Sequence, residues 1–260
     1  TASFDSTDNL ITDSGTLAIT GATTIDAGSA DITLTEAAST FGSLSLTGAN
    51  VAVTENDATE LAASTVSGTF DIISGGAITN SGALAITGAS TFTNTAGTDA
   101  AITLANTGNA FTGTVGFSTD SGSAVTVVDT TALDLQALTA VSLSVTAGGD
   151  VTDSGTLAIT GATTIDAGTA DITLTEAAST FGALALTGAN VSVVENAAME
   201  LAASTISGTA SFDSTDNVIT DSGTLAITGA TTIDAGTADI TLTEAASTFG
   251  ALALTGANVS

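Results

Sequence analysis

Seven residue types are missing from this chain of 260 residues: Lys, Arg, His, Cys, Pro, Trp and Tyr. Without His or Lys, no base can activate a serine or threonine nucleophile. Without His or Cys there are no ligands for zinc, haem or iron–sulfur centres. Carboxylate pairs can hydrolyse glycosides, but here the acidic residues recur in every repeat, as a surface pattern would. We therefore predict that the chain is not an enzyme and has no catalytic, cofactor-binding or metal-binding residues.

Positive charge is absent from the side chains. Asp and Glu together number 27, so the formal net charge is −27. Nucleic acids and anionic membrane surfaces are bound through Lys and Arg, which excludes both as partners. Self-repulsion keeps a chain with 43% hydrophobic residues in solution. The natural counter-species are cations, either from solvent or as bound calcium.

The lack of Cys excludes a disulfide framework. Apolar runs are short and are interrupted by Thr, Ser and Gly, so no transmembrane helix of ~20 residues is predicted. No signal peptide is visible. The sequence starts and stops inside a repeat, and we expect it to be a window of a longer array.

Repetition is the main positive feature. Residues 1–52 recur as 209–260, and most of 12–56 recurs as 152–196. The first pair of copies differs at five positions, which are Leu10/Val218, Ser29/Thr237, Ser43/Ala251, Ser45/Ala253 and Ala52/Ser260. Such fidelity is typical of a modular array. A recurring Thr-Asp/Asn-Ser-Gly phrase divides one continuous segment, 1–260, into supra-repeats at about 11–77, 78–150, 151–218 and 219–260.

Alternation of apolar and polar residues with a period of two predicts β-strands. Clear examples lie at 31–36, 43–47, 50–54, 101–104 and 140–146. Breaks rich in Gly, Asn and Asp, which favour turns, lie at 26–28, 47–50, 74–76 and 147–150. The best helical segment, 56–63, is short and is better interpreted as a corner between strands.

Each supra-repeat has room for about nine short strands, which gives coils of about 22 residues with three strands each. We therefore predict an all-β fold, a three-sided parallel β-helix or solenoid with about a dozen coils. The predicted inward residues are Leu17, Ile19, Ile32, Leu34, Leu44, Leu46, Val51 and Val53, with equivalents such as Leu157, Ile159, Ile172 and Leu174. The alternative is a string of Ig-like β-sandwiches, but these need about 100 residues each and usually a large aromatic core residue.

Three phrases, at 61–68, 76–88 and 109–115, resemble the repeats of filamentous-haemagglutinin-like giant exoproteins. These are bacterial surface proteins with β-strand repeats, and the resemblance covers essentially the whole chain. It implies a right-handed β-solenoid, secretion across the outer membrane, and a role in adhesion, aggregation or an extracellular fibre. The family's secretion domain is not seen in this sequence.

Calcium is the one metal that the composition suits, because its ligands are oxygens. The candidate ligands are Asp5, Asp8 and Asn9, repeated as Asp213, Asp216 and Asn217, together with Glu55, Asp57 and Glu60. Neither the EF-hand spacing nor the Gly-rich nonapeptide of calcium-binding β-rolls is present, which favours solvated turn residues. Asn50, Asn190 and Asn258 lie at equivalent turns, where stacked Asn ladders would be structural.

The composition and the repeats together predict a mechanical role, as a rigid acidic fibre or stalk on a bacterial surface. Such a protein would associate with itself end to end or laterally, and would meet other cells or surfaces. One alternative is an adhesin that binds a receptor or glycan through a solenoid face, although the Tyr, Trp and Arg of typical hot spots are absent. Another is a calcium-dependent surface-layer or matrix protein.

Overall fold

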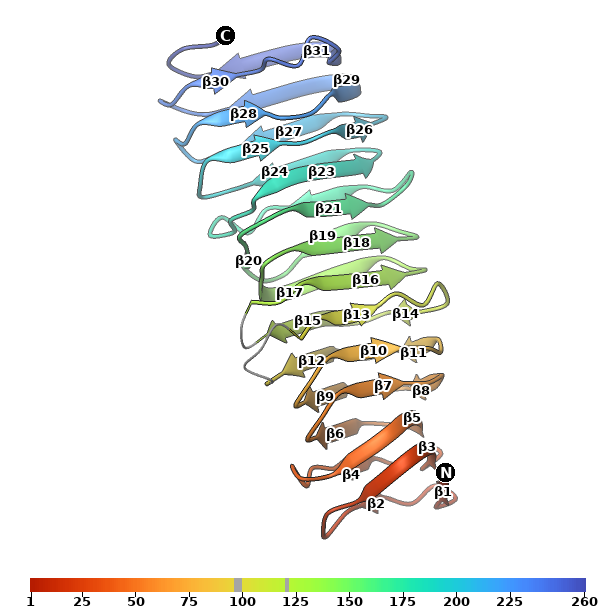
Figure 1. Cartoon of the computed structure of the whole chain (residues 1–260). Coiled ribbons are helices and arrows are strands. Elements are labelled where there is room, and N and C mark those ends of the chain that lie inside the picture. The colour runs from red at the N-terminus through yellow and green to blue at the C-terminus, as the bar shows by residue number, and fades with distance from the viewer. Residues whose placement is uncertain (96–99, 120–121) are drawn as a thin grey trace. The chain divides into compact units, whose positions relative to one another are not determined.

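The structure is a computed structural model that describes residues 1–95, 100–119 and 122–260 (Figure 1). All 31 elements in these residues are β-strands, and none is a helix. The described residues accordingly include no helix that is long and apolar enough to cross a membrane. The chain divides into two compact units, Thr1–Thr131 and Ala132–Ser260. Parallel strands stack in about 12 coils, which confirms the predicted β-solenoid.

In the first unit, three ladders of parallel strands connect each coil to the next. One ladder is β2–β4–β6–β9–β12–β15, a second is β1–β3–β5–β7–β10–β13–β16, and a third, β8–β11–β14, begins at the end of β5. The strands are β1 (Ala2–Asp5), β2 (Ile11–Thr12), β3 (Ala18–Asp26), β4 (Ile32–Leu34), β5 (Thr40–Gly48), β6 (Val51–Glu55), β7 (Thr59–Leu61), β8 (Ser64–Val66), β9 (Phe70–Ser74), β10 (Ile78–Asn80), β11 (Leu84–Ile86), β12 (Ser90–Asn94), β13 (Ile102–Leu104), β14 (Ala110–Phe111), β15 (Thr114–Thr119) and β16 (Val125–Asp129).

The second unit is built in the same way. One ladder is β17–β19–β22–β24–β27–β29–β31 and another is β18–β21–β23–β25–β28–β30, while β20 pairs with β17 and β26 joins β23 to β29. The strands are β17 (Leu133–Ala140), β18 (Leu143–Ala147), β19 (Val151–Asp153), β20 (Leu157–Ile159), β21 (Thr163–Asp166), β22 (Ile172–Leu174), β23 (Ala183–Gly188), β24 (Val191–Val194), β25 (Met199–Leu201), β26 (Ser204–Ile206), β27 (Ala210–Asp213), β28 (Ile219–Asp221), β29 (Leu225–Asp234), β30 (Ile240–Thr241) and β31 (Thr248–Thr255).

Coil length varies within narrow limits. Paired residues are 17 apart at Leu44 and Leu61, and 25 apart at Ser90 and Val115, which brackets the predicted value. Within each unit, the chain runs one way along the nearer strands and returns along the farther ones as it climbs (Figure 1). In the first unit the nearer strands β7, β10 and β13 run from left to right as the chain climbs, so the coil is right-handed, the hand that twisted parallel strands favour (Figure 1). Because the chain has no Pro, every backbone N–H can take part in the ladders.

The core of each unit consists of inward side chains that stack along the ladders. Ten of the twelve predicted inward residues are buried, among them Ile32, Val51 and Leu174. Leu17 and Ile19 are only half-buried, whereas their equivalents Leu157 and Ile159 are buried. Leu17 directly precedes β3, and Ile19 lies near its start. Among the described residues, this start of β3 pairs with β5, whereas β1 pairs only with the end of β3, so one side is uncovered.

Phenylalanine rings pack against one another in the core of the first unit. The ring of Phe92 lies edge-on to those of Phe70 and Phe111, with centroids 5.8 Å and 6.0 Å away, and stacks on that of Phe117 at 5.8 Å. Edge-to-face and offset-stacked pairs are favourable arrangements of aromatic rings. The segment 56–63, interpreted as a corner, contains the short strand β7 and no helix.

Candidate functional site

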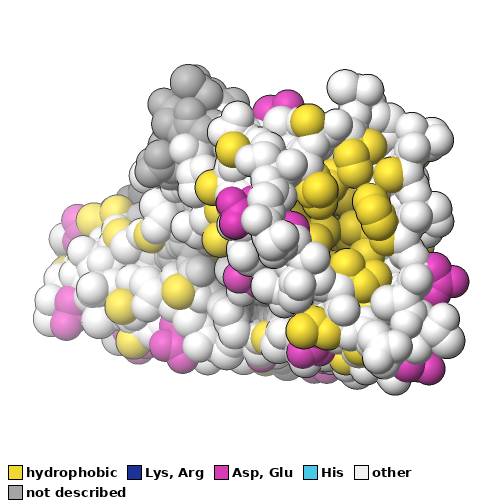
Figure 2. Space-filling view, turned by 90° about the horizontal axis from the view of Figure 1, so that it is seen from below, with side chains coloured by type: hydrophobic (Ala, Val, Ile, Leu, Met, Phe, Trp, Pro, Cys, Tyr) yellow, Lys and Arg dark blue, Asp and Glu magenta, His cyan; other side chains and the backbone are white. Residues whose placement is uncertain are grey.

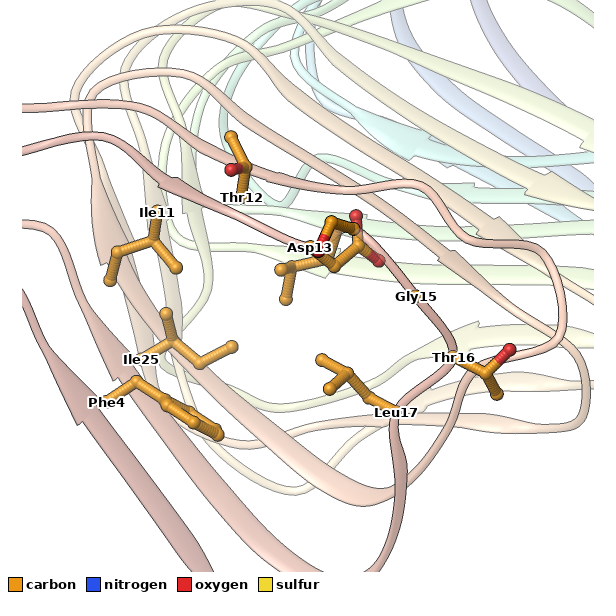
Figure 3. A pocket seen from close by; sticks show the side chains of 10 residues that line it. Phe4, Ile11, Thr12, Asp13, Gly15, Thr16, Leu17 and Ile25 are labelled. Atoms are coloured by element: carbon orange, nitrogen blue, oxygen red, sulfur yellow. The ribbon is translucent and has the colours of Figure 1, made fainter.

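A cavity of about 390 Å³ opens at the first coil of the first unit. Side chains of Phe4, Ile11, Leu17 and Ile25 point into it from β1, β2, β3 and the turn before β3 (Figure 3). Figure 2 looks onto this end of the unit and shows apolar side chains gathered in a hollow. The cavity is therefore the apolar interior of the solenoid seen end-on.

The repeated sequence shows what covers this surface elsewhere in the chain. Phe4 is 41% exposed, but its equivalent Phe212 is fully buried. In the second unit, the counterparts of β1, β2 and the start of β3 pair with β24, β25 and β26. Register places Val193 beside Phe212 and Met199 beside Ile219. The cavity is thus lined by residues whose equivalents in the second unit are covered by another solenoid coil.

The carboxylate that borders this cavity is already engaged. The two oxygens of Asp13 accept the backbone N–H groups of Thr35 at 3.2 Å and of Glu36 at 3.1 Å, both in the next coil. Asp153 and Asp221 make the same pair of bonds in the third and fourth supra-repeats. The arrangement joins successive coils, and it offers no nucleophile with a neighbouring base.

A second set of polar contacts runs along a corner of the solenoid. In the first unit, the side-chain Nδ2 of Asn50 donates to Asp31 at 2.9 Å, and its Oδ1 accepts from the N–H and the hydroxyl of Thr69 at 3.0 and 3.1 Å. Asn190 repeats these contacts in the second unit, between Asp171 and Thr209. Asn50 and Asn190 therefore do not stack on other Asn residues, because each has Asp on one side and Thr on the other.

The candidate calcium ligands of the first repeat form hydrogen bonds with the backbone of turns. Asp5 accepts the N–H of Thr7 at 3.0 Å, and Asp8 accepts the N–H of Ser29 at 2.7 Å, a contact that holds the pKa of Asp8 below its ordinary value. The amide of Asn9 donates to the carbonyls of Ser6 and Thr7. The second copy, with Asp213, Asp216 and Asn217, forms the same contacts.

The other candidate group is divided between the core and the surface, although Asp57 stays close enough to Glu55 to affect it. Glu55 points into the core, whereas Asp57 and Glu60 are exposed. Over the residues that the structure describes, no three acidic side chains lie together in a way that could hold a metal ion.

Buried carboxyl groups are a feature that the sequence reasoning missed. Glu195 is fully buried, and Glu55 and Asp129 are each 2% exposed. Each accepts the backbone N–H of a phenylalanine in the preceding coil, at 2.6 Å from Phe181, 2.7 Å from Phe41 and 3.2 Å from Phe111, respectively. The signal was present as parity: each acid comes two residues after a buried Val in an alternating strand, as in Val191, Val193, Glu195.

Burial dominates the protonation of these groups. It raises the pKa of Glu195 to about 8, against the opposing effect of the Phe181 N–H. It raises the pKa of Glu55 to about 7, where the nearby Asp57 carboxylate adds to the rise. The pKa of Asp129 is also raised by burial. Loss of hydration disfavours the charged form of a carboxyl group.

No curated protein and no solved structure matches this chain. A repeat family does, in four consecutive stretches at residues 1–47, 48–118, 122–187 and 188–256. These matches cover nearly the whole chain. Together with the stacked coils they show that the chain belongs to the family described as repeats of unknown function (DUF5649).

Proposed function

We propose that this chain is a structural segment of a rigid, acidic extracellular fibre or stalk on a bacterial surface, of the filamentous-haemagglutinin-like kind, without enzymatic activity or a cofactor. One observation carries the proposal. The contact between coils is a repeated unit, since the amide of Asn joins Asp of the preceding coil at 2.9, 2.9 and 2.7 Å at positions 50, 190 and 258. A coil that meets its neighbour in the same way at three places along the chain can be duplicated without redesign of the interface.

Mechanical strength would come from two sources that act along the coil axis. Backbone hydrogen bonds join each strand to the coils on either side, and the inward ladders of Ile, Leu, Val and Phe exclude water between them. Breaking one coil away from the next would require the loss of both at once. These features suit a spacer, and they do not depend on any single residue.

Self-association is the partner relationship that the open coil supports. Phe4, Ile11 and Leu17 form an apolar wall of the cavity, beside the polar stretch 12–16. The same surface in the second copy is covered by β24, β25 and β26. A further repeat coil stacked there, from the same chain or from a second copy, would extend the ladders. A receptor or glycan would instead be expected to use aromatic and Arg side chains on an outer face.

The proposal is tested by varying the number of repeats. A version of the chain that carries residues 1–208 twice should form particles longer by about 4.8 Å for each added coil, measured by electron microscopy. Antibodies raised against the chain should label intact cells of the bacterium that produces it. Particles of unchanged length would contradict the fibre role, and labelling only after lysis would contradict the surface location.

A further inference from the structure

Glu55 and Glu195 are placed alike in the two units. Glu55 is the last residue of β6, and Glu195 directly follows the last residue of β24. Both side chains lie on the inward side, and one oxygen of each accepts a phenylalanine N–H. The second oxygen, Oε2, is buried in both cases and has no hydrogen-bond partner among the residues that the structure describes. An ionised Glu195 would lack both water and a second donor, whereas at Glu55 the nearby Thr59 hydroxyl opposes part of the rise in pKa that burial causes.

The chain offers no side chain that could neutralise such a charge. Lys, Arg and His are absent, so an ion pair with a side chain cannot form. A buried carboxylate without a partner costs several kcal/mol, and the usual remedy is to bind a proton. A protonated Oε2 carries no charge and keeps the Phe N–H bond at Oε1.

We propose that the folded solenoid binds a proton at Glu55 and at Glu195 near neutral pH, and that these two protons make the solenoid more stable in mild acid than in mild alkali. The inference does not rest on the surface location, because it follows from the interior of each unit. Asp129 is a third buried carboxyl, and its Oδ2 likewise has no hydrogen-bond partner among the described residues. Its Oδ1, however, accepts from both the N–H and the hydroxyl of Thr131 at 3.0 Å each, and these bonds favour the ionised form.

The two sites differ in the side chains two and four residues after each Glu. At Glu55, the Asp57 carboxylate acts on the site. At Glu195, Ala197 and Met199 take the places of Asp57 and Thr59.

Other acids lie on the neighbouring strands and turns but are not buried. Those near Glu55 are Glu36, Glu60 and Asp71, and those near Glu195 are Glu176, Glu200 and Asp213. All of these groups are acidic, so each one that interacts with the sites opposes their ionisation.

The direction of the pH effect follows from proton binding. The ordinary pKa of Glu is 4.5, and the folded pKa values are about 7 at Glu55 and about 8 at Glu195. Between these limits the folded chain holds more protons than the unfolded chain, so the free energy of unfolding falls as pH rises. This loss of stability with rising pH has not begun below the ordinary pKa of Glu, and it is complete above the folded pKa values of both sites.

The direct test is a titration of the whole chain with ¹³C-labelled Glu side chains, which number seven. Two carboxyl signals should titrate at about pH 7 and about pH 8. Glu55→Gln and Glu195→Gln should each remove one of them, and the exposed controls Glu60→Gln and Glu200→Gln should remove neither. Full ionisation of all seven carboxyls by about pH 6 would overturn the proposal.

Stability gives an independent readout. The urea midpoint of the unaltered chain should decrease as the pH is raised from about 5 to about 8. In the double variant Glu55→Gln, Glu195→Gln, unfolding over this pH range should release about two fewer protons, so the midpoint should depend less on pH. The double control Glu60→Gln, Glu200→Gln should retain it. An unchanged slope in the first variant would overturn the proposal. If that variant does not fold, the titration of the unaltered chain still decides.

Discussion

Glu195 and Phe181 are joined inside the core of the second unit, where the carboxyl Oε1 accepts the phenylalanine N–H at 2.6 Å. Glu55 and Phe41 repeat the contact at 2.7 Å in the first unit. The bond connects a strand end to a buried phenylalanine one coil away, and it uses only one of the two carboxyl oxygens. The structural repeat and the proton-binding site are therefore products of the same sequence unit.

Asp57 and Ala197 lie two positions after Glu55 and Glu195, and exchanging these two residue types should stabilise the chain at one site and destabilise it at the other. Asp57→Ala removes a negative charge that raises the pKa of Glu55, so the chain should become more stable at about pH 8, by ~0.5 kcal/mol because Asp57 is exposed. Ala197→Asp should destabilise at the same pH. Urea unfolding at about pH 5 is the control, because both Glu residues are then protonated in the folded state. Equal effects at the two pH values would refute the account.

Close approach of successive coils should make some glycines irreplaceable. A Cβ on Gly223 would lie 2.3 Å from the backbone nitrogen of Ala203, whereas a Cβ on its equivalent Gly15 would meet nothing within 4 Å. Gly223→Ala should therefore destabilise by about 2–4 kcal/mol, and Gly15→Ala should change stability by less than about 1 kcal/mol. The measurement is chemical unfolding followed by circular dichroism. Similar losses for both variants would show that the coils are not packed as described.

The corner contacts should contribute modestly. Asn190→Ala removes the amide that donates to Asp171 and the oxygen that accepts from Thr209. We expect a loss of about 1–2 kcal/mol, since the site is exposed and water replaces part of the bonding. Asn196→Ala, at an exposed position in the turn after β24, is the control and should hardly change the free energy of unfolding. Hydrogen exchange at Thr209 should increase in the first variant only.

Core truncation should separate the two copies of one sequence. Phe212→Ala empties a fully buried position and should cost about 3–5 kcal/mol. Phe4→Ala changes the equivalent residue in the open first coil, which is 41% exposed, and should cost about 1 kcal/mol. Thermal unfolding of the two variants measures the difference. A large loss for Phe4→Ala would mean that another coil covers this end in solution.

Strand positions were predictable because alternation reports burial directly. Ile32, Leu34, Val51 and Val53 read as inward from the period of two, and all four are buried. The short strand β7 was not predicted as a strand, since Asp57 and Glu60 interrupt the apolar pattern around it. The exposure of Leu17 was not predictable from its own repeat, because it depends on which coil lies beneath.

Buried carboxyls escaped the sequence reasoning for a physical reason. A Glu next to Asn and Asp at a turn has the composition of a solvated corner, as at Glu55, and only its inward parity argues otherwise. The Asn contacts were placed at the correct turns, but their partners were not identified. Asp31 and Thr69 each lie 19 residues from Asn50, a spacing that is set by coil length rather than by local pattern.

Electron microscopy of the purified chain, with and without a calcium chelator, decides whether the stacked coils hold together without calcium. We expect elongated particles with an axial repeat of about 4.8 Å that survives chelation, because backbone ladders and apolar side chains hold the coils together. Absence of that repeat would contradict the stacked coils. Particles that dissolve on chelation would contradict a self-sufficient structural solenoid and would indicate a calcium-dependent surface assembly.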